Sequence, residues 1–154
     1  MLKRGSEAPD FTLPDQDGQP RSLAELVDGN PLILYFYPAD FTPGCTREAC
    51  ELRDLHARIV ASGLRVAGIS PQSLESHRRF RQEHALPFML LSDEDKAVIR
   101  DYGVDGPLGI GVRRATYLID AHRRITDAVL ADFRIGRHRA FAERAIAARA
   151  GRSA

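Results

Sequence analysis

Mostly apolar segments of strand length recur along the chain. Residues 32–37, 64–70 and 88–91 are such segments, and the first carries three aromatic side chains among its six residues. Runs of this kind are typical of strands buried on both faces of a sheet. Residues 115–120 and 125–131, separated by a short polar turn, predict two further strands that pair with each other.

Apolar residues at helical spacing lie between and after these strands. The repeat runs from 45 to 60, and Gly63 is placed to end that helix. Three more helices are predicted, at 73–84, from Ser92–Asp93 to about 102, and at 137–149. Ser73 is the preferred N-cap of the first of these three, with Ser76 as a competing choice. Residues 103–111 contain four glycines and one proline and predict a loop.

The N-terminal segment predicts a separate strand pair. Residues 11–13 and 20–23 flank a polar turn, which is the pattern of a β-hairpin. The predicted order is therefore hairpin, β, α, β, α, β, α, β, β, α. This order implies a mixed sheet with helices on both faces. We therefore expect an α/β protein with a thioredoxin-like fold, a central mixed β-sheet flanked by helices, and an N-terminal β-hairpin extension.

Length and composition are those of one globular domain. The 154 residues suit a single core, so one domain spanning 1–154 is expected. Apolar residues make up 44%, charged residues 28%, and the formal net charge is +1. The chain therefore lacks the basic character of a nucleic-acid-binding protein. Basic stretches at 78–81 and after Arg134 are interpreted as solvated helix faces, with no nucleic-acid or membrane contact.

The sequence favours a cytoplasmic protein. No apolar segment approaches the roughly 20 residues of a membrane span, and no apolar stretch follows the first charged residues. The chain has two cysteines, Cys45 and Cys50, which are too few for a disulfide framework. No cluster of Cys and His with metal-ligand spacing surrounds them, so no metal site is expected.

Cys45 follows a predicted buried strand and a Pro-Gly break, and it lies in the first turn of a predicted helix. A helix N-terminus leaves backbone N–H groups unpaired and carries a partial positive charge. Both features favour a thiolate over a thiol, and the thiolate is the nucleophilic form of cysteine. The alternative is a small buried apolar residue, a frequent role of an isolated cysteine.

The surrounding sequence resembles a known family. Residues 38–45, Pro-Ala-Asp-Phe-Thr-Pro-Gly-Cys, match the pattern P-x-x-x-T-x-x-C of the peroxiredoxin active site. Cys50 follows at the C-x-x-x-x-C spacing of the Q-type, or bacterioferritin-comigratory, subgroup. Residues 5–13 are similar to the opening strand of that family, and residues 114–120 to its R-x-S/T-F/Y-L-I-D segment. The resemblance covers most of the chain and implies a thiol peroxidase on a thioredoxin-like fold.

The resemblance also implies roles for individual residues. Cys45 is the peroxidatic cysteine, whose thiolate is oxidised to a sulfenic acid. Arg114 stabilises the thiolate and the charge that develops as the O–O bond breaks, and Thr42 offers its hydroxyl to the peroxide. Pro38 shields the site from water. Glu48 orients the arginine; the alternative is an acidic residue favoured there only by the helix dipole.

Arg114 and Cys50 each have an alternative. The family arginine matches Arg114 rather than Arg113, and neighbours in an extended segment point to opposite faces, so only one can face Cys45. Arg113 is then a solvated charge at the rim. The resemblance implies that Cys50 is the resolving cysteine, which forms an intramolecular disulfide with Cys45. Its five-residue offset matches the subgroup, and it is the only other cysteine in the chain. The alternative is a buried helix cysteine without a chemical role.

The expected activity is reduction of hydrogen peroxide and organic hydroperoxides, an antioxidant function that uses no metal and no organic cofactor. The expected reductant is thioredoxin or a similar dithiol, and the expected state is a monomer. Two other classes of protein are alternatives. A thiol–disulfide oxidoreductase of the thioredoxin type would carry C-x-x-C and a proline where Arg114 and Ala115 stand. A redox sensor or holdase would need an exposed apolar groove or a partner domain, which the sequence does not indicate.

Overall fold

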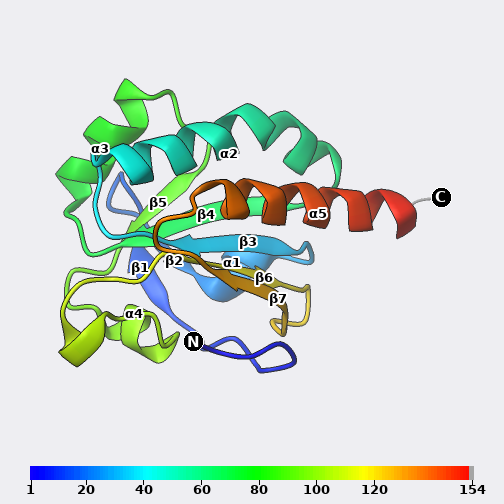
Figure 1. Cartoon of the computed structure of the whole chain (residues 1–154), viewed down its shortest axis with the longest axis horizontal. Helices are drawn as coiled ribbons and strands as arrows, with labels where there is room; N and C mark the ends of the chain where they lie inside the picture. The colour runs from blue at the N-terminus through cyan, green and yellow to red at the C-terminus, as the bar shows by residue number, and fades with distance from the viewer. Residues whose placement is uncertain (153–154) are drawn as a thin grey trace.

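A mixed five-stranded sheet forms the centre of the protein in a computed structural model, which describes residues 1–152 (Figure 1). The strand order is β5-β4-β3-β6-β7. The strands are β3 (Leu32–Phe36), β4 (Arg65–Ser70), β5 (Met89–Ser92), β6 (Ala115–Ile119) and β7 (Ile125–Leu130). The first three run parallel, whereas β6 is antiparallel to both β3 and β7. The expected thioredoxin-like sheet is confirmed; residues 153–154 of the predicted domain lie outside the described residues.

Helices cover both faces of this sheet. One face carries α2 (Pro43–Ala61), α3 (Leu74–Glu83) and α5 (Gly136–Arg152), and the other carries α1 (Leu23–Val27) and α4 (Ala97–Asp101) (Figure 1). Successive residues of β3 pack alternately into the two hydrophobic cores. Leu34 packs in the core beneath α1 and α4, and Tyr35 packs in the core beneath α2 and α5. Burial on both faces explains why residues 32–37 are continuously apolar.

The N-terminal strand pair is present as predicted. β1 (Thr12–Pro14) and β2 (Pro20–Ser22) pair antiparallel and form the expected extension. The short helix α1, which the sequence reading did not include, follows β2 directly. Its start is a capping box, in which Ser22 accepts a hydrogen bond from the backbone N–H of Glu25 and the Glu25 carboxylate accepts one from that of Ser22. The predicted second arm at 20–23 therefore passes straight into a helix.

The helix predicted from Ser92–Asp93 begins later than expected. Ser92 belongs to β5, and α4 starts only after Lys96, which has a left-handed backbone conformation with φ 63°. Asp93 nevertheless serves this helix, because its carboxylate accepts a 2.7 Å hydrogen bond from the backbone N–H of Ile99. The loop at 103–111 includes a short 3-10 helix, η1 (Pro107–Gly109). Within residues 1–152, no helix is long and apolar enough to cross a membrane.

Candidate active site

Cys45 lies in the first turn of α2, where the chain enters the helix from the end of β3. Thr42 is the N-cap residue and has extended backbone angles, and Pro43 takes the first helical position, where a missing N–H costs no hydrogen bond. Cys45 is almost fully buried, with 1% of its surface exposed. The first turn contains no acidic side chain, so the partial positive charge of the helix N-terminus acts on the sulfur unopposed by a carboxylate within that turn.

Arg114 reaches this sulfur from the segment just before β6. Its Nη2 donates a 3.2 Å hydrogen bond to Sγ of Cys45, and its Nη1 donates a 2.8 Å bond to Oε1 of Glu48. The backbone N–H of Arg114 is also held, by the carboxylate of Asp132. Arg113 pairs instead with Oδ2 of Asp132, and 42% of its side chain is exposed. The guanidinium beside the buried thiol is therefore that of Arg114.

Glu48 is the buried counterion of this arginine. Only 1% of its side chain is exposed, and burial raises the pKa of Glu48 to about 7, although Arg114 acts to lower it. Burial alone would lower the pKa of Arg114, but the neighbouring Glu48 and Cys45 raise it overall. The second carboxylate oxygen, Oε2, has no hydrogen-bond partner and lies 3.4 Å from Nδ1 of His138. Burial of the charged Glu48 carboxylate thus costs free energy, and the interaction with Arg114 offsets part of that cost.

Gly44 allows the arginine to approach the helix. A Cβ atom at Gly44 would lie 3.1 Å from Nη2 of Arg114 and 3.4 Å from Cδ1 of Ile135. The 3.4 Å approach to Ile135 is close to ordinary van der Waals contact, but the 3.1 Å approach to Arg114 is tighter than most Cβ contacts. The guanidinium has little freedom to move because Cys45 and Glu48 both hold it. The absence of a side chain at Gly44 is therefore part of the geometry of the site.

An open depression of about 730 Å³ lies over these groups. Pro38, Thr42, Gly44 and Arg114 line it from the sheet and the helix start, and its far rim is mainly apolar and includes Phe133. The hydroxyl of Thr42 donates a 2.9 Å hydrogen bond to the carbonyl of Ala39, so its oxygen remains available as an acceptor. The structure thus brings five of the six predicted site residues, Cys45, Thr42, Pro38, Arg114 and Glu48, to one place.

Cys50 is the sixth predicted residue and lies further along α2. It is half-buried, and both cysteines are free thiols. In a regular helix, residues five apart have Cα atoms about 8.6 Å from each other, whereas a disulfide requires about 7 Å or less. The uninterrupted helix therefore keeps the two sulfurs apart. Nδ1 of His84, at the end of α3, lies 3.9 Å from Sγ of Cys50.

A buried polar cluster anchors the loop that precedes Cys45. Asp40 accepts hydrogen bonds from the hydroxyls of Tyr37, at 2.6 Å, and Ser76, at 2.8 Å, and its Oδ2 lies 2.7 Å from Nδ1 of His77. Sequence reasoning missed this cluster, as it missed His138. Asp40 occupies a variable position of the motif, and the histidines lie in no motif. No local sequence pattern distinguishes these buried histidines from solvent-exposed ones.

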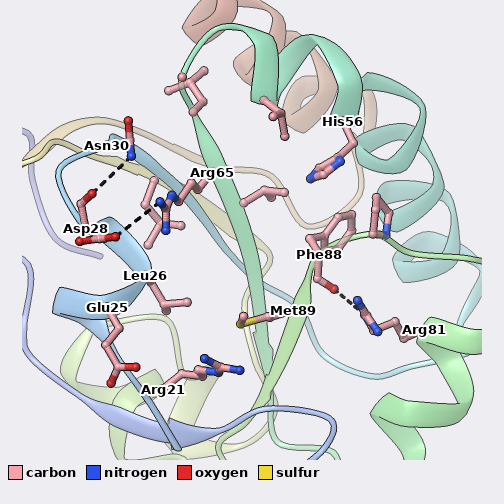
Figure 2. A pocket seen from close by; sticks show the side chains of 16 residues that line it. Arg21, Glu25, Leu26, Asp28, Asn30, His56, Arg65, Arg81, Phe88 and Met89 are labelled. Carbon is pink, nitrogen blue, oxygen red and sulfur yellow. Dashed lines mark hydrogen bonds and ion pairs between the residues drawn. The ribbon is translucent and has the colours of Figure 1, made fainter. Parts of the chain in front are cut away.

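A second hollow, of about 750 Å³, lies near the edge of the sheet and contains neither cysteine (Figure 2). Its cationic side chains are already engaged. Arg65 faces Asp28 at 3.7 Å, and Arg81 donates to the carbonyl of Phe88 at 3.0 Å. Among residues 1–152, no group of three or more His, Cys, Asp or Glu side chains could hold a metal ion. The cysteine centre is therefore the candidate active site.

The fold and this centre define a thioredoxin-like protein with a buried thiol held between a helix N-terminus and an arginine. Residues 4–128 match the AhpC/TSA family. A chloroplastic peroxiredoxin Q of Sedum lineare is 48% identical over 120 residues, which cover 77% of this chain and 64% of that protein. A putative peroxiredoxin bcp of Coxiella burnetii is 46% identical over 125 residues, 77% of this chain and 82% of that one. The chain belongs to the AhpC/TSA family, and the resemblance to Q-type peroxiredoxins is confirmed.

Solved structures agree with this assignment. The crystal structure of peroxidoxin BcpB from Mycobacterium tuberculosis has a TM-score of 0.90 and 36% identity, covering 96% of this chain and 98% of that one. A peroxiredoxin Q structure from Xanthomonas campestris has a TM-score of 0.81 and 28% identity, covering 92% and 90%. The chain spans 64% of the length of the Sedum lineare protein and 55% of a putative peroxiredoxin Q from Oryza sativa subsp. indica.

Proposed function

We propose that this protein is a thiol peroxidase that reduces hydrogen peroxide and organic hydroperoxides. The observation that carries the proposal is the 3.2 Å contact between Nη2 of Arg114 and Sγ of Cys45 at the start of α2. A guanidinium and a helix N-terminus both stabilise negative charge, first on the sulfur and then on the oxygens of a breaking peroxide bond. Membership of the AhpC/TSA family supports the same activity.

In the first step, the thiolate of Cys45 attacks one oxygen of the hydroperoxide. An S–O bond forms and the O–O bond breaks, so the sulfur is oxidised by two electrons to a sulfenic acid. The other oxygen leaves with the electron pair and takes up a proton, giving an alcohol or water. Arg114 stabilises the developing charge, and the Thr42 oxygen accepts the O–H of the bound peroxide, since its own proton is directed to Ala39.

In the second step, the thiol of Cys50 loses its proton and its sulfur attacks the sulfenic sulfur of Cys45. An S–S bond forms, and the hydroxyl leaves as water after taking up a proton. Because the intact helix keeps the sulfurs too far apart, the first turns of α2 must unwind for this bond to form. A dithiol reductant of the thioredoxin type then restores both thiols by thiol–disulfide exchange.

Several properties belong to the same proposal. The reaction needs no metal and no organic cofactor, because the sulfur itself carries the two electrons. Pro38 limits the access of water to Cys45, and Glu48 orients Arg114 through its 2.8 Å bond. We further propose a single domain over 1–154, a monomer and a cytoplasmic location. The monomer is supported by the edge strand β5, which has only four residues, and the location by the low cysteine number.

The test compares wild type with Cys45→Ser and Cys50→Ser in stopped-flow oxidation by hydrogen peroxide. Cys45→Ser should lose the rapid step, whereas Cys50→Ser should still reduce one equivalent and hold a sulfenic acid. The reverse pattern would exchange the two roles. Reduction of insulin disulfides without consumption of peroxide would indicate a thiol–disulfide oxidoreductase. Oxidation that the dithiol reductant cannot reverse would indicate a stoichiometric sensor.

A further inference from the structure

The resolving thiol of Cys50 has a neighbour that the peroxide step does not use. Nδ1 of His84 lies 3.9 Å from Sγ of Cys50, although the two residues are 34 positions apart in the sequence. This distance is within the longer range of hydrogen bonds to sulfur, and both side chains are half-buried. An imidazole can accept and return a proton near neutral pH, and a thiol must lose its proton before it can act as a nucleophile.

Contacts from two helices hold His84 in place. His84 is the C-cap of α3, and its backbone N–H donates a 3.1 Å hydrogen bond to the carbonyl of Phe80. Its own carbonyl accepts a 2.9 Å bond from Nη1 of Arg53 on α2. The rings of Phe80 and His84 pack edge to face, with centroids 5.1 Å apart. The His84 backbone is therefore anchored, and Phe80 packs against its ring while the ring lies beside the sulfur.

We propose that His84 is a catalytic residue of the disulfide-forming step. This inference rests on the proposed peroxidase function. Nδ1 accepts the proton of the Cys50 thiol as the sulfur attacks the sulfenic acid at Cys45. The S–S bond forms, the S–O bond breaks, and the departing hydroxide takes up a proton to leave as water. One proton leaves the thiol and one is taken up by the hydroxide, so the step is neutral overall. No further oxidant is consumed.

The same contacts indicate which part of α2 moves. Arg53 lies three residues after Cys50 and ties that turn to the end of α3 through the His84 carbonyl. Within residues 1–152, no side-chain hydrogen bond joins the turns of α2 before Cys50 to α3. We infer that Cys45 travels toward Cys50 when the first turns unwind, while Cys50 and His84 stay together. The base is then present at the moment the disulfide forms.

His56 provides a matched control on the same side of the molecule. It lies on α2, is partly buried, and packs against the ring of Phe88 with centroids 6.2 Å apart, so it does not share the contact of His84 with the thiol. His56→Gln and His84→Gln therefore make the same chemical change at two histidines, only one of which touches the resolving sulfur. His84→Gly adds a variant whose missing ring can be replaced by free imidazole.

The experiment is a single turnover with one equivalent of hydrogen peroxide. Peroxide loss measures the first step, and mass spectrometry after acid quench or dimedone trapping measures sulfenic acid and disulfide separately. His84→Gln should form the disulfide about 100-fold more slowly, as for loss of a general base, with peroxide loss at the wild-type rate and a longer-lived sulfenic acid. His56→Gln should behave as wild type, and free imidazole should accelerate disulfide formation in His84→Gly.

Three results would overturn the assignment. One is an unchanged rate of disulfide formation in His84→Gln. The second is an equal slowing of peroxide loss and disulfide formation, which would mean a general disturbance of the fold. The third is a slow His84→Gly that imidazole does not accelerate, which would make the ring a structural element. A wild type that consumes no peroxide would instead remove the proposed function, and this proposal with it.

Discussion

Replacing Glu48 by Gln should change the pH dependence of stability in a defined direction. The carboxylate is buried, and its pKa is about 7 in the folded protein against an ordinary value of 4.5. Its raised pKa means that the folded state binds the proton more tightly than the unfolded state. Glu48 therefore contributes stability that is fully present below about pH 4.5 and is lost as the pH rises through 7. The difference between 4.5 and about 7 corresponds to about 3 kcal/mol.

Other buried groups contribute to the same curve, so the comparison must be between variants. Burial raises the pKa of Asp93, which adds a slope of the same sign, and lowers the pKa of His138, which adds one of the opposite sign. Both groups remain in Glu48→Gln. Arg114, Cys45 and Glu51 also stay in place around the new amide. Subtracting the two pH profiles therefore isolates the Glu48 carboxyl.

The assay is urea unfolding of the reduced protein at intervals between pH 5 and pH 8. The wild type should lose about 2–3 kcal/mol more of its unfolding free energy over this range than Glu48→Gln does. Glu143→Gln is the control, because Glu143 forms an exposed pair with Arg139 and should leave the wild-type slope unchanged. Parallel profiles for wild type and Glu48→Gln would refute the argument, since the carboxyl would then have the same proton affinity in both states.

Four further outcomes follow from the site. Arg114→Ala should raise the barrier of peroxide attack by about 2–4 kcal/mol and Arg113→Ala far less; equal second-order rates in stopped flow would contradict this. Gly44→Ala should slow the same step about 10- to 100-fold, because its Cβ displaces the guanidinium, and an unchanged rate would mean that the arginine has room. Asp40→Ala should lower the unfolding free energy by about 2–4 kcal/mol, since its buried partners lose their acceptor; an unchanged urea midpoint would count against it. Amide exchange over 44–52 should be faster in the disulfide form, and equal protection would exclude unwinding.

The strands were the most predictable part of the fold. Alternate residues of β3 face separate apolar cores, and double burial leaves an unbroken apolar run in the sequence. The five-residue helix α1 was not predictable from periodicity, because it is too short to repeat an apolar face. The start of α4 was predicted too early because aspartate is a residue type that favours the N-cap position. The Asp93 carboxylate does accept a hydrogen bond from a backbone N–H of the helix, but Asp93 itself lies before the helix begins.

The site was predictable only where a motif carried it. The resemblance named Arg114 and Glu48, and the structure pairs them across 66 sequence positions. His84 and His138 were not singled out, because a lone histidine on a helix has the same local pattern whether it faces solvent or a sulfur. Their significance depends on which helices the sheet brings together, and that information lies in the packing of α2 against α3 and α5 rather than in any short segment.

The two halves of the proposed chemistry place opposite demands on the start of α2. Peroxide attack uses the formed helix, because its N-terminus and Arg114 converge on Cys45 only when that turn is wound. Disulfide formation needs the same turn to open. The structure anchors the chain on both sides of it: Asp40 is fixed by a buried cluster before the turn, and Arg53 binds the end of α3 after it. Opening can therefore be confined to the residues between these anchors. Arg114 holds this turn through both Cys45 and Glu48, and in the proposed mechanism the attraction to Cys45 depends on the negative charge of the sulfur. Oxidation to a neutral sulfenic acid removes that charge, so the first step itself weakens one of the contacts that oppose the second.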